Sequence, residues 1–175
     1  GSHVWISTNA HYFYDDEGNI NGVEGTIRDI TARKKAEDDL KNSERGLSEA
    51  QRIAHLGSWE WDITTNLISW SDELCRIYGL EPGEVAPSFE YFLSLLSEET
   101  KIIVTDAVDK ALAGTTEYDI EFPITLGNGQ KHIVNAQAEV IRGHDGKPIK
   151  MVGTTHEITE YKQAEDEKEH LQREL

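Results

Sequence analysis

The sequence predicts an α+β domain in which helices cover one face of an antiparallel sheet. Two short strands come first, several helical segments follow, and three strands with alternating apolar residues close the domain. A gapless internal repeat aligns Val4–Glu37 with His132–Glu165, and such self-similarity organises the whole chain. The helical segments beside both copies carry apolar residues at alternating spacings of three and four, which makes them prone to form coiled coils.

Each copy of the repeat is predicted to be a β-hairpin followed by a charged helix. The aligned identities include Gly25 with Gly153, and a glycine-centred turn joins the two strands of each copy. We expect residues 4–31 to be the C-terminal hairpin of an incomplete upstream domain. The second copy is expected to close a complete domain over residues 57–159. Residues 1–3, Gly-Ser-His, have the sequence of an expression-tag remnant and are left out of the fold.

Between the two copies the chain is expected to begin with a linker helix over residues 32–56, ended by Gly57. A C-terminal signalling helix is expected over residues 160–175. The strands of the complete domain are predicted over residues 58–63, 67–70, 118–126, 134–140 and 149–158.

Three helices are predicted between these strands. Ser71 is expected to cap the first, which ends near Gly79, and the second covers residues 89–96. The longest covers residues 97–113 and ends before Gly114. Its buried face is expected to contain Ile102, Val104, Ala107, Val108 and Leu112.

The chain is strongly acidic, with 33 Asp and Glu against 17 Lys and Arg and a formal net charge of −16. Nucleic acid and anionic membrane surfaces repel such a chain, so neither is expected as a partner. Cys75 is the only cysteine, so an intrachain disulfide is excluded and no metal site is expected. We find no signal peptide, no membrane-spanning run and no nucleophile set beside a base. A cytoplasmic protein without enzymatic activity is therefore expected.

Three motifs carry a family resemblance through their order and spacing. Residues 50–62 join the end of a helix to a first strand, residues 69–79 hold the second strand and first helix, and residues 153–159 read Gly-Thr-Thr-His-Glu-Ile-Thr. Together they resemble the PAS domains of bacterial and archaeal sensory proteins. The last resembles the PAC motif, which usually contains Asp-Ile-Thr. The upstream copy keeps this form at residues 29–31, whereas Glu157 replaces the Asp in the second copy.

The resemblance implies a five-stranded antiparallel sheet in the spatial order 2-1-5-4-3. It also implies that the junction between the last strand and the following helix transmits conformational change. Threonine at such a junction is suited to cap the first helical amides. The expected transmission residues are Asp29, Thr31, Glu157, Ile158 and Thr159.

PAS domains commonly bind small molecules between the sheet and the helices. The resemblance therefore implies a pocket there, although aromatic residues around two short strands are more often plain core. Close helix packing also explains the two small residues Ala136 and Ala138 without a cavity. The candidate pocket residues are Trp61, Trp70, Tyr78, Phe92, Val108, Phe122, Ala136 and Ala138.

Each cofactor class of the family needs particular residues. Haem-binding members usually ligate iron through a histidine on the long helix, and residues 101–113 contain none. Covalent flavin chemistry needs a cysteine on a mid-domain helix, whereas Cys75 lies on the first helix and is expected to pack as a small hydrophobe. Neither cofactor is expected. Non-covalent flavin stays open because four aromatic side chains are available to stack on its ring: Trp59, Trp61, Trp70 and Tyr78.

The linker and C-terminal helices each carry a heptad-like seam. Leu40 and Leu47 lie on the first seam, and Leu171 and Leu175 on the second. Two helices that leave equivalent points of a repeat with the same period favour a homodimer joined along these seams.

The expected function is that of a sensory or relay module in a multidomain two-component protein. Residues 167–175 resemble linkers that lead to a histidine kinase core, so a kinase domain in cis is the expected output. Two alternatives stay open. One is a constitutive dimerisation spacer without ligand, and the other is a flavin-binding redox sensor.

Overall fold

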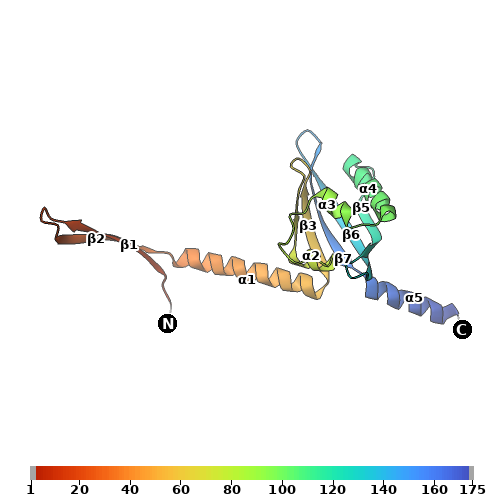
Figure 1. The fold of residues 1–175 in the computed structure, drawn as a ribbon, viewed down its shortest axis with the longest axis horizontal. Helices are drawn as coiled ribbons and strands as arrows, with labels where there is room; N and C mark the ends of the chain where they lie inside the picture. Colours follow the sequence, from red (N-terminus) through yellow and green to blue (C-terminus); the bar gives the residue numbers. More distant parts are fainter. Residues whose placement is uncertain (1–2, 174–175) are drawn as a thin grey trace. The chain divides into compact units, whose positions relative to one another are not determined.

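The computed structural model describes residues 3–173 (Figure 1). It contains two compact units, residues 1–47 and residues 48–175, and each is described by itself. Leu175, expected at the end of the second seam, lies outside the described residues.

The first unit is a β-hairpin followed by the greater part of a helix. Its elements are β1 (Ile6–Tyr14), β2 (Ile20–Asp29) and α1 (Thr31–Ile53), the last of which continues into the second unit. The strands pair antiparallel. Their turn places Gly18 at a φ of 82°, a conformation that glycine adopts without the clash of a Cβ.

The second unit is a five-stranded sheet with three helices on one face and a C-terminal helix. The strands lie in the order β4-β3-β7-β6-β5, and all neighbours pair antiparallel, which confirms the predicted order 2-1-5-4-3. Its elements are β3 (Leu56–Asp62), β4 (Leu67–Trp70), α2 (Asp72–Ile77), α3 (Phe89–Ser94), α4 (Glu98–Ala113), β5 (Tyr118–Thr125), β6 (Lys131–Arg142), β7 (Pro148–Glu157) and α5 (Thr159–Arg173).

The repeat in the sequence reappears in the strand register. Ile6 lies opposite Asp29 in the β1–β2 hairpin, and Val134 lies opposite Glu157 in the β6–β7 hairpin. Each of these residues differs from its counterpart by the same 128 positions. Both ladders also become irregular just before the last pair. The two copies therefore fold as the same hairpin.

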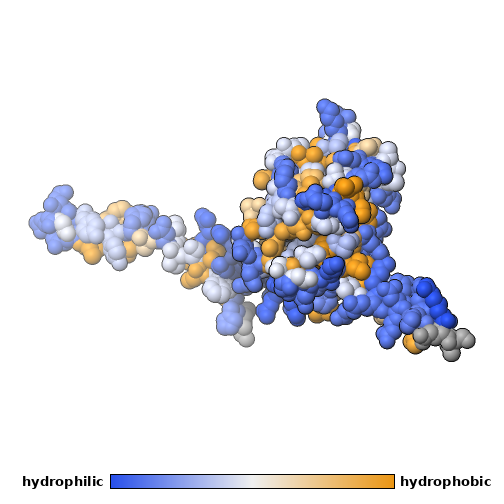
Figure 2. Space-filling view, turned by 45° about the vertical axis from the view of Figure 1, so that its right-hand side comes forward, coloured by the Kyte–Doolittle hydropathy of each residue, from blue (hydrophilic) through white to orange (hydrophobic). Residues whose placement is uncertain are grey.

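The core lies between the sheet and the helices α2, α3 and α4. Alternation along the strands sends every second side chain to this face. The most deeply buried apolar side chains are Leu74, Val104, Phe122, Val134 and Met151, contributed by two helices and three strands. In contrast, α5 presents a mostly hydrophilic surface (Figure 2).

Capping residues set the ends of α2 and α4, as predicted for Ser71 and Gly114. The Oγ of Ser71 accepts a hydrogen bond from the amide of Leu74, and the Oγ of Ser97 accepts one from the amide of Thr100. Gly114 ends α4 in the left-handed conformation, with a φ of 76°. These residues fix where the helices begin and end over the sheet.

The expectation that Gly57 ends the linker helix was wrong. The helix stops at Ile53, and His55 takes the left-handed conformation with a φ of 49°. Gly57 lies in β3, where a Cβ would stand 2.6 Å from the Cβ of Leu74. The glycine is therefore required for close packing of α2 on the strand.

The expected burial of Ile102 was also wrong, because its side chain is 71% exposed. The face of α4 that meets the sheet contains Thr100, Val104, Val108 and Ala111. Ile102 is two residues from Thr100, so it points to nearly the opposite side of the helix.

We predict that Gly57→Ala lowers the free energy of unfolding by about 1–3 kcal/mol, because the added methyl group overlaps Leu74. Gly127→Ala is the matched control, since a Cβ there meets no atom within 4 Å. We expect the control to stay within about 0.5 kcal/mol of the parent chain. Urea unfolding followed by tryptophan fluorescence measures both, and equal effects would contradict the packing described.

Candidate functional site

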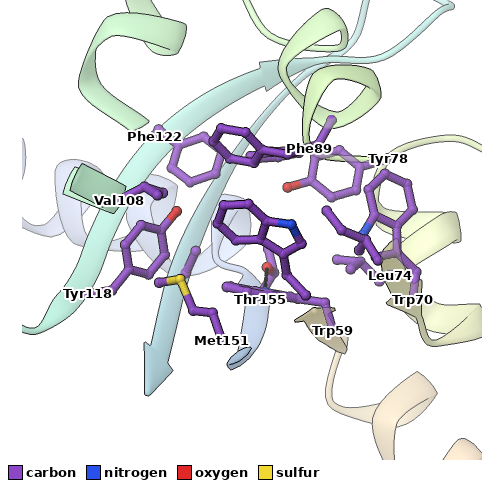
Figure 3. Close-up of a pocket in the computed structure, with 14 residues that line it drawn as sticks. Trp59, Trp70, Leu74, Tyr78, Phe89, Val108, Tyr118, Phe122, Met151 and Thr155 are labelled. Atoms are coloured by element: carbon purple, nitrogen blue, oxygen red, sulfur yellow. Dashed lines mark hydrogen bonds between the residues drawn. The ribbon is translucent and has the colours of Figure 1, made fainter. Parts of the chain in front are cut away.

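A small cavity lies between the sheet and the helices of the second unit (Figure 3). Its volume is about 40 Å³, which is room for about three water molecules at roughly 10–15 Å³ each. All the side chains that line it are uncharged. The cavity is therefore suited to water or a very small neutral group in this packed state.

Aromatic rings form most of the cavity wall. Trp61 stacks on Phe89 of α3 at 4.7 Å between ring centroids, and Trp70 stacks on Tyr78 at 5.4 Å. The indole of Trp59 lies across the middle of the group in Figure 3, with Tyr118 on one side. These contacts join both edges of the cavity to the helices above it.

Three buried hydroxyl groups supply polarity inside this apolar wall. The Oγ1 of Thr155, which is 2% exposed, accepts a hydrogen bond of 3.2 Å from the Nε1 of Trp59. Burial raises the pKa of Tyr78 and of Tyr118. Both phenols therefore stay neutral near pH 7, and the site offers hydroxyl groups without a formal charge.

A polar contact lies at the β3–β4 turn, beside the cavity residue Trp61. Asn66, at a φ of 56°, accepts a hydrogen bond of 3.0 Å from the Nε1 of Trp61 through its side-chain oxygen. Its side-chain nitrogen donates to the carboxylate of Glu90 at 3.0–3.1 Å. Asn66 thus links the strand that carries Trp61 to the helix α3 that carries Glu90.

Of the candidate pocket residues, the structure brings all except Ala138 into the lining. Ala138 lies on the same face, in a crowded place beside Gly153 and Trp59. Half of the lining was not among the pocket candidates, although Trp59 had been considered for stacking on a flavin ring: Trp59, Ile68, Leu74, Phe89, Tyr118, Met151 and Thr155. Alternation along the last strand was the available signal for Met151 and Thr155, because both share its inward face.

The expected transmission residues lie at two equivalent sheet-to-helix junctions. The Oγ1 of Thr159 accepts a hydrogen bond from the amide of Ile133 at 2.9 Å, and its amide donates to Oε1 of Glu157 at 3.0 Å. The buried Ile158 donates its amide to the carbonyl of Ile133 at 2.8 Å. Together these bonds tie the start of α5 to the neighbouring strands β6 and β7.

The upstream junction has the same bonds. The Oγ1 of Thr31 accepts from the amide of Trp5 at 2.9 Å, and the amide of Thr31 donates to Oδ1 of Asp29 at 2.8 Å. Hydrogen bonding of Asp29 to the side chain and then the amide of Thr31 lowers the pKa of Asp29. The junction is therefore a property of the repeat, independent of the cavity.

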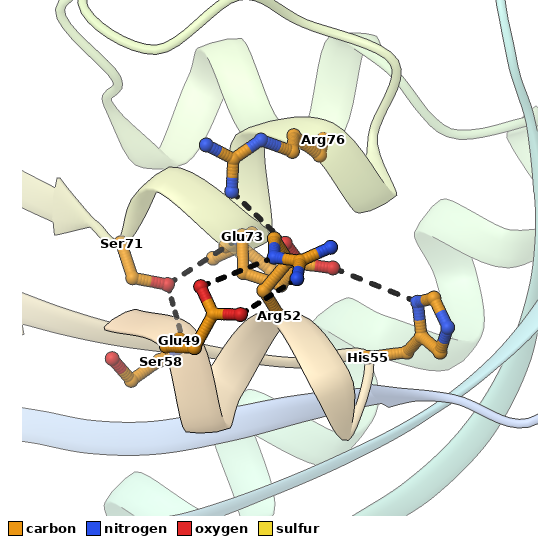
Figure 4. Close-up of polar contacts among 8 residues, drawn as sticks. Glu49, Arg52, His55, Ser58, Ser71, Glu73 and Arg76 are labelled. Carbon is orange, nitrogen blue, oxygen red and sulfur yellow. Dashed lines mark hydrogen bonds and ion pairs between the residues drawn. The ribbon is translucent and has the colours of Figure 1, made fainter. Parts of the chain in front are cut away.

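A polar cluster joins the end of α1 to α2 (Figure 4). Glu73 of α2 is 5% exposed, and its carboxylate meets Nη1 of Arg76 at 3.0 Å and Nδ1 of His55 at 3.6 Å. The carbonyl of His55 accepts a hydrogen bond of 3.0 Å from the amide of Glu157. The start of β3, where the chain enters the domain, thus lies beside the end of β7, where the chain leaves the domain.

The cofactor ligands considered from the sequence are not in the cavity wall. Cys75 is buried on α2, where burial and then Asp72 raise the pKa of its thiol. The lining contains neither this cysteine nor a histidine. Among residues 3–173, no group of three or more His, Cys, Asp or Glu is placed to hold a metal ion. No helix within the described part is long and apolar enough to cross a membrane.

An antiparallel sheet of this order, with helices over an aromatic-lined cavity, defines a small α+β sensor-type domain. A family model described as the PAS fold matches residues 67–155, which are 89 of the 175 residues. The chain belongs to the PAS family, whose domains occur in sensory signalling proteins.

Two curated relatives are similar over most of this chain. The blue-light-activated histidine kinase of Brucella anthropi is 26% identical over 94% of the chain. The probable diguanylate cyclase DgcE of Escherichia coli K12 is 25% identical over 83% of the chain. The alignments span only 33% and 13% of these two relatives.

Solved structures share the fold. The sensory box histidine kinase/response regulator of Burkholderia thailandensis E264 has a TM-score of 0.58 and 24% identity, over 73% of this chain and 98% of that one. An RNA-binding light-oxygen-voltage receptor has a TM-score of 0.54 and 16% identity, over 61% of this chain and 30% of that one.

We predict that the two buried tyrosines destabilise the domain at alkaline pH. An unfolded tyrosine loses its proton near pH 10, whereas the raised pKa keeps Tyr78 and Tyr118 protonated in the fold. Stability is therefore unaffected below pH 10 and falls above it, by about 1.4 kcal/mol per pH unit for each group. Unfolding titrations of the parent chain and of Tyr118→Phe measure the slope. An unchanged slope in the variant would contradict the burial.

Proposed function

We propose that the chain is a non-catalytic cytoplasmic relay module of a multidomain signalling protein. A ligand or partner changes the packing around the cavity, and the change passes through the sheet to α5. One observation carries this proposal: the same strand, β7, contributes to the cavity wall and to the junction with α5. Thr155 of β7 lines the cavity, and Glu157, two residues further, accepts the first amide of α5. Side chains at both positions point to the same face of the sheet.

The output domain that we propose is a histidine kinase in cis. Support comes from a relative and a solved structure that are both described as histidine kinases. A diguanylate cyclase is the second candidate, because DgcE aligns over a similar share of this chain. Since α5 follows the domain directly, either output receives its input through the same helix.

The ligand that fits the cavity as packed is small and neutral. Small-molecule pockets usually have volumes of about 300–1,000 Å³, whereas this cavity measures about 40 Å³. Flavin binding would require the tryptophan rings to move out of the space that they fill. The similarity to a blue-light-activated histidine kinase favours a flavin. The small cavity volume and the burial of Cys75 favour the absence of a flavin. We propose that this domain retains no flavin or haem.

We predict that the purified chain mixed with FMN or haem shows no visible absorption after gel filtration, because the tryptophan-filled cavity has no room for either ring system. The absorption spectrum of the protein peak is the measurement. A flavin or haem band in stoichiometric amount would overturn this part of the proposal and favour the redox-sensor alternative.

The relay also predicts an effect of filling the cavity. Ala136→Val adds two carbon atoms to a lining residue, and we expect a change of about two- to tenfold in amide exchange at Thr159 and Lys162 of α5. Glu139→Val is the matched control, because its exposed side chain lies on the same strand and the opposite face. If Ala136→Val changes the melting temperature without changing exchange in α5, the domain is a spacer and not a relay.

We further propose that residues 4–31 are the C-terminal hairpin of a second PAS domain. The support is the shared register and the shared junction described above. The face of this hairpin that corresponds to the core face of β6 and β7 carries the exposed side chains Ile6, Tyr12, Val23 and Ile27. Such an apolar face requires a covering partner.

The chain is also proposed to form a homodimer along α1. Leu40 and Leu47 are 61% and 63% exposed, and Leu171 of α5 is 58% exposed, so all three are available to a second copy. We predict that Leu40→Glu combined with Leu47→Glu yields a monomer in sedimentation equilibrium, because charge at core positions of a coiled coil is unfavourable. Asn42→Glu with Ser48→Glu adds the same charge off the seam and should leave a dimer. A monomeric parent chain at high concentration would contradict the seam.

A further inference from the structure

Two differences between the repeats fall at one place in the structure. At the junction with α5, His132 stands where the upstream copy has Val4, and Glu157 stands where it has Asp29. The threonine and its two hydrogen bonds are the same in both copies, although the amide that binds the threonine hydroxyl belongs to Trp5 upstream and to Ile133 here. The upstream hairpin thus serves as an internal reference for what these two residues add.

The longer side chain of Glu157 approaches a histidine while it still caps the first amide of α5. Its Oε1 accepts the amide of Thr159 at 3.0 Å, much as Asp29 does in the upstream copy, and lies 3.7 Å from Nδ1 of His132. That nitrogen is buried and has no hydrogen-bond partner among the described residues. When both ring nitrogens carry a proton, Nδ1 is a donor and the ring is positively charged, facing the carboxylate that caps α5.

The surroundings of Glu157 favour the ionised form of its carboxylate. Burial acts to raise its pKa, but the hydrogen bonds from Thr159 and the nearby imidazoles of His132 and His55 outweigh burial and lower the pKa. Its side chain is only 16% exposed, so solvent weakens a contact with His132 less than at the surface.

The other charged groups around this end of the sheet have different partners. His55, in the turn before β3, faces Glu73 of α2 at 3.6 Å, and Glu73 is held by Arg76. From α5, Lys162 binds Glu121 of β5 at 2.8 Å. The residue opposite His132 on β5 is the uncharged Ile124.

We propose that His132 and Glu157 form a proton-operated contact that tightens the attachment of α5 to the sheet when His132 is protonated. The proton adds a second donor to the oxygen that already holds the amide of Thr159, so it fixes the carboxylate in its capping position. Imidazole is the side chain whose ordinary change of charge falls between about pH 5 and pH 8, so this is the range over which the contact is tested. Its effect on an output domain rests on the relay function proposed above, but the contact itself does not.

The test uses the whole chain and replaces each residue with its counterpart in the upstream copy. Amide exchange at Thr159 and Lys162, corrected for the intrinsic effect of pH, is compared at about pH 5.5 and about pH 8. We expect the parent chain to be protected about three- to fivefold more at the lower pH. His132→Val and Glu157→Asp should both abolish this difference. Glu157→Asp should keep the cap, because Asp29 makes the same bond at 2.8 Å.

Two control variants separate His132 from the other histidines nearby. His156→Gln should leave the pH response unchanged, since His156 is exposed on β7. His55→Gln should keep most of the response, since His55 lies near Glu157 but faces Glu73 at 3.6 Å. A response that survives both His132→Val and Glu157→Asp, or that disappears in His55→Gln, would overturn the proposal. Ala136→Val at constant pH reports on the relay independently, so failure of one experiment does not imply failure of the other.

Discussion

Thr159 joins three elements of the domain through two hydrogen bonds. Its hydroxyl accepts the amide of Ile133 at the start of β6, and its amide binds the side chain of Glu157 at the end of β7. Because α5 begins at this residue, the helix cannot shift without altering a bond to one of the strands. Thr31 holds the same position in the upstream copy. This arrangement is the physical basis of the relay that we propose between the sheet and α5.

The cavity and the junction are connected by the geometry of β7. Met151 and Thr155 contribute to the cavity wall, and Glu157 follows on the same face of the strand. Three stacked or edge-on aromatic contacts, centred on Trp59, Trp61 and Trp70, fill most of the space above them. Since packed interiors respond to the addition of a single methylene group, a small occupant is sufficient to displace these rings. In the relay that we propose, the small cavity therefore limits the size of the ligand.

Much of the fold was predictable because the repeat is a sequence pattern with a structural meaning. The offset of 128 residues predicted two equivalent hairpins, and the structure shows the same register in both. Gly57 was misread because its role depends on Leu74, 17 positions away, and no local pattern reports such a contact. The burial of Ile102 was mispredicted because two adjacent isoleucines do not show which side of α4 meets the sheet. The buried Thr100 identifies that side, but only once the sheet is known.

The site was less predictable than the fold. Aromatic residues on β3 and β4 indicated the correct wall, but Thr155 and Tyr118 became candidates only when their strands were paired around the cavity. Asn66 gave no signal in the sequence, since its role arises from a turn that places Trp61 and Glu90 within reach. Polar residues that act by bridging distant segments are the ones that periodicity cannot identify.

Amide exchange at the two threonine junctions tests the central claim most directly. Thr159→Ala should speed exchange of the Ile133 amide by about five- to tenfold and loosen the start of α5, because the acceptor of that amide is lost. Thr31→Ala should do the same to the Trp5 amide and leave Ile133 unchanged. If neither amide responds, the threonines do not hold the helices to their hairpins, and the coupling between sheet and helix described for this chain is wrong.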